Sequence, residues 1–132
     1  MAKIILVAGT ANTGKTKSIR LFLESLGVFH EKQIGDLVLV VPPLAAGKKR
    51  TLGVATGGDN LTVVSKSLTF IEQYKWDVIV CASKSQGVTF GYVQRFAASH
   101  KAQLIVINTK RVKAGAVAAT IQSTAAQISQ RL

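Results

Sequence analysis

The chain has 132 residues, of which 48% are hydrophobic and 17% charged, and its 17 Lys and Arg exceed its 6 Asp and Glu by a formal net charge of +11. This length suits one domain with a real core, over residues 1–132, and the composition excludes a disordered tail. No apolar stretch approaches the roughly 20 residues that a membrane-spanning helix needs, so we expect no membrane partner.

The first predicted element is a strand over Lys3–Ala8. Its continuous run of apolar and β-branched residues is typical of a strand buried on both faces of a parallel sheet. Because the chain enters this strand almost at once, the sequence leaves no room for a removable signal peptide. We therefore expect a cytoplasmic protein.

A glycine-rich segment joins this strand to a predicted helix over Lys15–Leu26, and it matches the pattern G-x-x-x-x-G-K-[ST]. Glycines permit a tight turn, and successive backbone N–H groups together with a helix N-terminus point at anionic oxygen. We expect Lys15 to reach the β- and γ-phosphates of a nucleotide and the Thr16 hydroxyl to ligate Mg²⁺. The predicted phosphate-binding residues are Gly9, Thr10, Ala11, Asn12, Thr13, Gly14, Lys15 and Thr16.

The rest of the chain alternates predicted strands with predicted helices, which indicates an α/β fold with helices on both faces of a mostly parallel five-stranded sheet. The further strands are Asp36–Val41, Thr51–Ala55, Asp77–Ala82 and Gln103–Ile107, and the further helices are Asn60–Lys75, a segment around Tyr92–His100, and Ala114–Leu132.

Residues 42–50 form a connection too short for a helical crossover, and two prolines open it. The strands on either side of it should pair as an antiparallel hairpin, so that one edge strand runs against the others. The cluster Lys48-Lys49-Arg50 would then lie at the sheet edge opposite the phosphate site. It could serve a nucleic-acid or acidic-protein partner, or keep an edge hairpin soluble.

Asp59 is the best candidate for the carboxylate that a phosphate site of this kind uses to hold magnesium. It follows the predicted third strand and two glycines, which could bring the backbone close to phosphate. The same position suits an N-cap for the following helix. We assign Lys15 and Asp59 as catalytic residues and Thr16 and Asp59 as metal ligands, and the capping role of Asp59 stays open.

The predicted fifth strand leads into Asn108-Thr109-Lys110-Arg111, which has no aspartate to accept from the N–H groups of guanine. ATP is therefore a better candidate than GTP. Lys110 or Arg111 could pack its side chain against the base, or the two could form an exposed basic loop.

Three other segments give weaker expectations. The glycine- and hydroxyl-rich stretch from Ser83 to Tyr92 could be a flexible connection that binds a second substrate or a partner, with Lys84 or Arg95 neutralising charge. A return loop over 28–35 holds His30, Glu31 and Gln33, which could orient an attacking water or be solvated. Cys81 lies in an apolar run, which favours burial over reactivity.

The glycine-rich segment resembles the Walker A motif of the P-loop NTPase superfamily, and the order of elements is similar to that of small GTPase cores, without their base-reading N-K-x-D motif. The resemblance implies a three-layer P-loop fold and Mg²⁺-dependent binding of a nucleoside triphosphate. Three functions are consistent with it: slow ATP hydrolysis that controls a partner, transfer of the γ-phosphoryl group to a small acceptor by a kinase, or a nucleic-acid-associated ATP module. The oligomeric state stays open.

Overall fold

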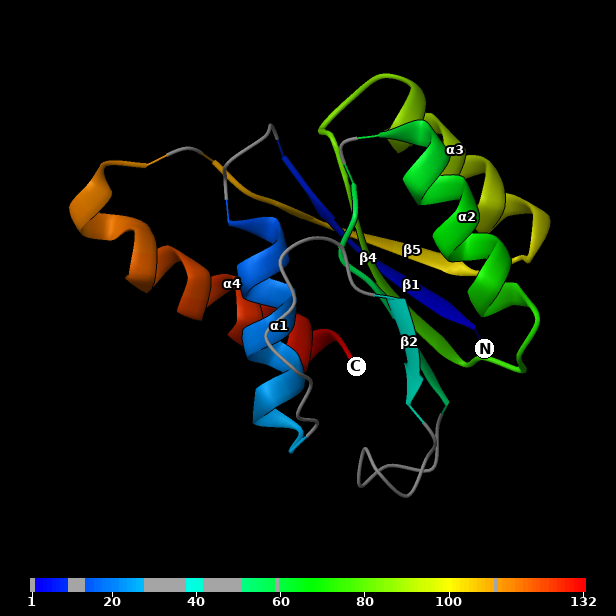
Figure 1. Cartoon of the computed structure of the whole chain (residues 1–132), viewed down its shortest axis with the longest axis horizontal. Helices are drawn as coiled ribbons and strands as arrows, with labels where there is room; N and C mark the ends of the chain where they lie inside the picture. Colours follow the sequence, from blue (N-terminus) through cyan, green and yellow to red (C-terminus); the bar gives the residue numbers. More distant parts are fainter. Residues whose placement is uncertain (1, 10–13, 28–37, 42–50, 59, 111) are drawn as a thin grey trace.

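The computed structural model describes residues 2–9, 14–27, 38–41, 51–58, 60–110 and 112–132. Strands and helices alternate along these residues, apart from two strands that follow each other before the second helix (Figure 1). The elements are β1 (Lys3–Ala8), α1 (Lys15–Ser25), β2 (Val38–Val41), β3 (Leu52–Ala55), α2 (Leu61–Glu72), β4 (Val78–Ser83), α3 (Val88–Ser99), β5 (Gln103–Asn108), a 3₁₀ turn η1 (Ala114–Ala116) and α4 (Val117–Arg131).

The centre of the molecule is a parallel sheet in which the strands lie in the order β3-β4-β1-β5. At the β3 edge, β2 pairs antiparallel, with Val38 opposite Ala55 and Val41 opposite Leu52. The predicted α/β class with parallel strands and helices is confirmed. The strand order also shows that β4 separates β1 from β3, so two strands flank β1 directly, β4 and β5.

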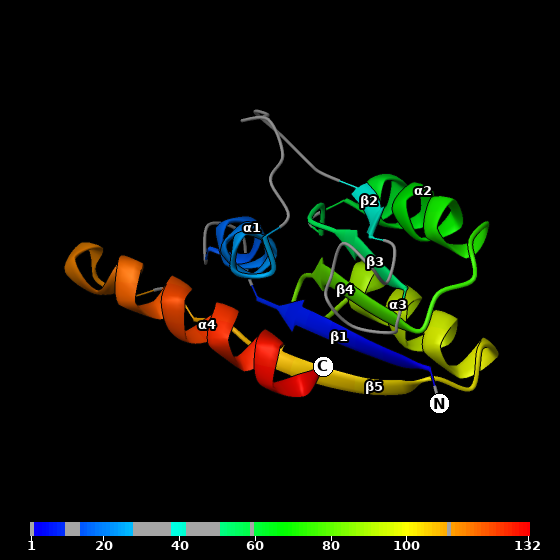
Figure 2. The ribbon, with the colours of Figure 1, turned by 90° about the horizontal axis from the view of Figure 1, so that it is seen from below.

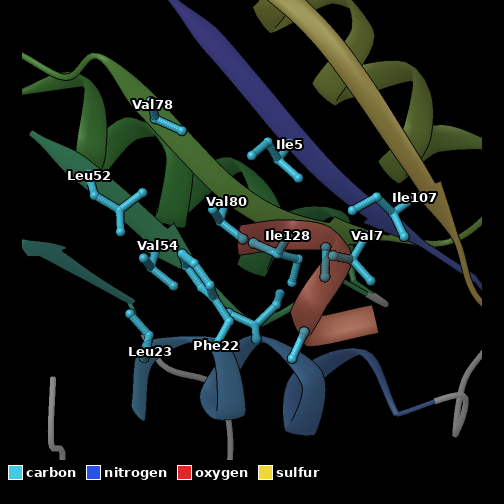
Figure 3. Packing of buried hydrophobic residues seen from close by; sticks show 13 residues of the cluster. Ile5, Val7, Phe22, Leu23, Leu52, Val54, Val78, Val80, Ile107 and Ile128 are labelled. Atoms are coloured by element: carbon cyan, nitrogen blue, oxygen red, sulfur yellow. The ribbon is translucent and has the colours of Figure 1, made fainter. Parts of the chain in front are cut away.

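Helices cover both faces of the sheet, with α1 and α4 on one side and α2 and α3 on the other (Figure 2). Successive strand residues point to opposite faces, so Ile5 and Val7 join the core under α1 and α4, whereas Ile4 and Leu6 join the core under α2 and α3. Figure 3 shows Phe22 of α1 and Ile128 of α4 packed against the first of these faces. This double coverage explains why β1 reads as one unbroken apolar run.

Gly53 in β3 sets how closely α2 approaches the sheet. A Cβ added there would lie 2.5 Å from Cγ2 of Ile71, a fully buried side chain of α2. Such a distance is well inside van der Waals contact, so the missing side chain of Gly53 leaves the space that Ile71 fills. The helix α2 is thereby seated tightly on the sheet.

Several expected helix details are wrong. The third helix begins at Val88, not near Tyr92, so the second half of the predicted flexible connection is helical. Leu61 and Val117 stand at helical spacing with buried residues of their helices, which predicts burial, but they are 41% and 38% exposed. Each stands first in its helix, and the first turns of α4 extend past the sheet, where no core is available to them (Figure 1).

Cys81 is buried in β4, as expected. Burial raises the pKa of its thiol from 9.0 to about 12, because the apolar surroundings penalise the thiolate. A thiol held neutral in this way is a poor nucleophile and metal ligand, so its role is structural.

Candidate functional site at the carboxyl edge of the sheet

The residues of the candidate site gather where the parallel strands end. In the sheet register, Ala8 at the end of β1 lies level with Ser83 of β4 on one side and Asn108 of β5 on the other. The turns that leave these strands therefore start side by side. In open parallel sheets this edge is where ligands bind.

Lys15 is the central charge of the site. It is the first residue of α1, its side chain is only 5% exposed, and its Nζ donates to the carbonyl oxygens of Gly9 at 2.6 Å and Ser83 at 3.2 Å. The backbone N–H of Gly9 donates to the same Ser83 carbonyl at 3.1 Å. The ammonium group is thus held among backbone dipoles at the ends of β1 and β4, which is how a buried cation avoids the cost of desolvation.

Gly14 turns the chain into α1. Its φ of 82° is a left-handed conformation that side-chain-bearing residues rarely adopt, and an added Cβ would lie 3.0 Å from Cγ1 of Ile121 in α4. Its carbonyl accepts from both the N–H and the hydroxyl of Ser18. Gly14 makes no side-chain cap and the first turn has no acidic residue, so the first N–H groups of α1 can receive an anion.

Thr16 connects α1 with the end of β3. Its Oγ1 lies 3.4 Å from the carbonyl oxygen of Thr56, a long hydrogen bond, and Thr56 itself is buried. A hydroxyl group therefore lies between the first turn of α1 and the β3 exit, the region from which the chain continues to Asp59. Asp59 lies outside the described residues, together with Thr10, Ala11, Asn12 and Thr13 of the glycine-rich segment.

Gly58 brings the β3 exit against β4. A Cβ at this position would lie 2.6 Å from the carbonyl carbon of Ala82 and 2.7 Å from the backbone nitrogen of Ser83. Two residues later, Asn60 caps α2 by accepting from the N–H groups of Thr62 and Val63. The N-cap considered for Asp59 thus belongs to Asn60, and that part of the prediction is wrong by one residue.

A groove of about 370 Å³ with both polar and apolar lining residues opens beside the site, between the end of β5 and α4. Thr109 anchors its floor by donating from its N–H and hydroxyl to the Ala8 carbonyl, at 2.7 and 3.1 Å. Lys110, predicted to contact the base, lines the groove and is exposed. The other lining residues are Asn108, Val112, Ala116, Ala119, Thr120, Ser123, Thr124 and Gln127. Arg111 lies outside the described residues.

The β4–α3 connection lies on the other side of Ser83. The Ser83 hydroxyl donates to the Lys84 carbonyl at 2.7 Å, and the Lys84 N–H donates to Oγ1 of buried Thr89 at 3.2 Å. Lys84 and Arg95 are both exposed. The return loop with His30, Glu31 and Gln33 and the cluster Lys48-Lys49-Arg50 lie outside the described residues, so the expectations placed on them stay predictions.

Two features of the site escaped the sequence reasoning. The Ser83 carbonyl, which receives Lys15, depends on the position of β4 next to β1, and no residue pattern indicates that strand order. The wall of the groove that α4 forms carries Thr120, Ser123 and Thr124 at helical spacing, and this polar stripe is visible in the sequence alone.

Among the described residues, no group of three or more His, Cys, Asp or Glu side chains could hold a metal ion. No helix in the same part of the chain is both long and apolar enough to cross a membrane. Comparison with known proteins finds no matching family model, and no match among curated proteins or solved structures.

Proposed function

We propose that this chain is a P-loop nucleoside triphosphatase that binds ATP with Mg²⁺ and hydrolyses it slowly, with the nucleotide state controlling a partner. The observation that carries the proposal is the placement of Lys15, an ammonium group held at the ends of β1 and β4 at the start of a helix whose N-cap residue, Gly14, makes no side-chain cap. A three-layer α/β arrangement around this point is the architecture that the proposal requires.

The phosphates would bind over the N-terminus of α1. Lys15 would exchange its carbonyl acceptors for oxygens of the β- and γ-phosphates, and the backbone N–H groups of the turn would bind the remaining oxygens. Charge-assisted hydrogen bonds of this kind are each worth about 1.5–3 kcal/mol, and the gain on binding is the difference between the bonds to phosphate and the carbonyl bonds that Lys15 gives up. Thr16 and Asp59 would hold the magnesium ion, whose charge would help neutralise the transferred phosphoryl group.

The nucleoside would lie in the groove beside β5. This groove adjoins the phosphate site because Thr109 is bonded to Ala8, the residue before Gly9. Its described lining offers hydroxyl, amide and ammonium groups but no carboxylate, which supports adenine over guanine. Lys110, with Arg111 beside it in sequence, would pack against the base.

A small kinase is the second candidate, favoured by the exposed segment that leaves β4. Lys84 and Ser85 follow directly after Ser83, whose carbonyl receives Lys15, so an acceptor bound there would lie near the γ-phosphate. Phosphate release from ATP and Mg²⁺ without an acceptor would support hydrolysis. Strict dependence of turnover on an added acceptor would support the kinase.

The deciding experiment is a thermal-shift panel with ATP and GTP, each with and without Mg²⁺. A ligand at about 100 times its Kd stabilises the folded chain by about 2.7 kcal/mol, which is a shift of several degrees. We expect the largest shift with ATP and Mg²⁺. Lys15→Ala should abolish it with the fold intact, whereas Lys17→Ala, an exposed lysine two residues along the same helix, should not. An unchanged ATP shift in Lys15→Ala would refute the site.

A further inference from the structure

In the part of the chain that the structure describes, the outer edge of β5 is an open hydrogen-bonding surface. β5 is the last strand of the sheet, and its Gln103 and Thr109 ends donate their backbone N–H groups to Ala2 and Ala8 on the β1 side. In a parallel strand the N–H and C=O of one residue point to the same neighbour, and this direction alternates along the strand. Leu104, Val106 and Asn108 therefore direct their backbone groups away from β1, and no described strand pairs with them.

This edge lacks the features that usually protect an edge strand. Charged side chains, proline and bulges normally discourage pairing with another chain. β5 reads Gln-Leu-Ile-Val-Ile-Asn, has no charge and no proline, and pairs with β1 residue for residue without a bulge. Val106 at its middle is 37% exposed, although helices cover both faces of the sheet. Figure 2 shows β5 along the outer side of the sheet.

We propose that two copies of this chain associate through their β5 edges, forming one continuous sheet across a two-fold axis. A two-fold axis makes the two strands antiparallel, and an axis at Val106 sets Leu104 opposite Asn108 of the second copy. All three outward-facing residues then pair within the strand. An axis at Ile105 or Ile107 would instead leave one of these three outward-facing residues opposite a residue outside β5. The inference goes beyond the proposed function and does not depend on it.

A second copy suits this edge because the edge is neutral in a chain of net charge +11. Charge repulsion between two such chains is weakest where they meet through uncharged surface. The α4 segment Val117–Gln130, which packs beside β5, is also uncharged, and its Val117 is exposed. Lys101 and Lys110 stand beyond the two ends of β5 and would approach each other across the axis. Salt screens such like-charge contacts, so association should strengthen as salt rises.

The test begins with the mass of the full chain in solution, measured by sedimentation over a range of protein concentration. We expect a concentration-dependent dimer that is favoured by added salt. Val106→Lys should raise its Kd by about tenfold, because the two lysines would face each other directly across the axis. Val106→Glu should do the same, and an equimolar mixture of the two variants should associate again. Leu61→Lys, a similarly exposed site on α2, is the matched control and should leave the Kd unchanged.

Hydrogen exchange reports the pairing residue by residue. In the dimer, the amides of Leu104, Val106 and Asn108 should become protected, whereas those of Ile105 and Ile107 are already bonded to β1 and should change little. A monomer at every concentration and salt would overturn the proposal. So would a dimer that Val106→Lys and Leu61→Lys weaken equally, or one in which the β5 amides gain no protection.

Discussion

Gly58→Ala tests whether the β3 exit must touch β4 to build the site. The added methyl carbon would lie 2.6 and 2.7 Å from backbone atoms of Ala82 and Ser83, whereas ordinary contacts begin near 3.4 Å. The overlap is thus about 0.8 Å, and both partners are buried backbone in the middle of the sheet, which cannot rotate away as a side chain can. Overpacking of this kind costs about 1–3 kcal/mol, and we expect the upper part of that range.

The assay is denaturant unfolding of Gly58→Ala beside Gly115→Ala, because an added Cβ at Gly115 meets nothing within 4 Å. We expect a loss of about 3 kcal/mol for Gly58→Ala, which for a domain of this size lowers Tm by about 10 °C, and no loss for the control. The ATP-dependent thermal shift should also fall, because Ser83 would be displaced from Lys15. Equal stability of the two variants would refute the close-contact reasoning.

Three further predictions concern Asn60, Cys81 and Asp59. Asn60→Ala should cost about 1 kcal/mol in denaturant unfolding through loss of the α2 cap, and Asn60→Asp should recover most of it. Cys81 has a folded pKa of about 12 against 9.0 in the reference state, so its contribution to stability is complete below pH 9 and is lost between pH 9 and 12. Relative to Cys81→Ala, the natural chain should lose up to about 1.4 kcal/mol per pH unit in that interval, and a constant difference would contradict the burial argument. Asp59→Asn should weaken magnesium-dependent turnover more than ATP binding, and equal effects on both would argue against a metal role.

The parallel strands could be predicted because continuous apolar runs in the sequence indicate that both faces of each strand are buried. In the runs around Ile5 and Val80, the residues that point to either face of the sheet are apolar. This pattern is typical of strands whose two faces are both covered by helices. Lys15 could be placed at a helix start because Gly14 immediately precedes it and adopts the left-handed turn that glycine permits. In both cases, neighbouring residues determine the structure.

The rest depends on contacts between distant parts of the chain. The sequence does not indicate the helix start at Val88, because the preceding glycine and hydroxyl residues are typical of a loop, whereas Gly87 adopts a φ of 91° and leads directly into the helix. Leu61 and Val117 have the helical spacing of core residues but stand first in their helices and are exposed. Hydrophobic periodicity predicts which side of a helix is apolar. It does not predict how many turns of that side pack against the sheet.

Ser83 shows why the site is only partly visible in the sequence. Its carbonyl accepts from Gly9 and Lys15, its backbone nitrogen lies against Gly58, and its hydroxyl bonds to the Lys84 carbonyl at the start of the connection to α3. Three turns of the sheet edge thus meet at one residue, mainly through backbone atoms that every amino acid carries. Loss of the Lys15 hydrogen bond would leave that carbonyl with the Gly9 N–H, while the next residue, Lys84, donates its own N–H to Thr89 of α3. A substitution of the Ser83 side chain would leave this carbonyl in place, so the contact between the start of α1 and the β4–α3 connection depends on the strand order rather than on the residue type at position 83.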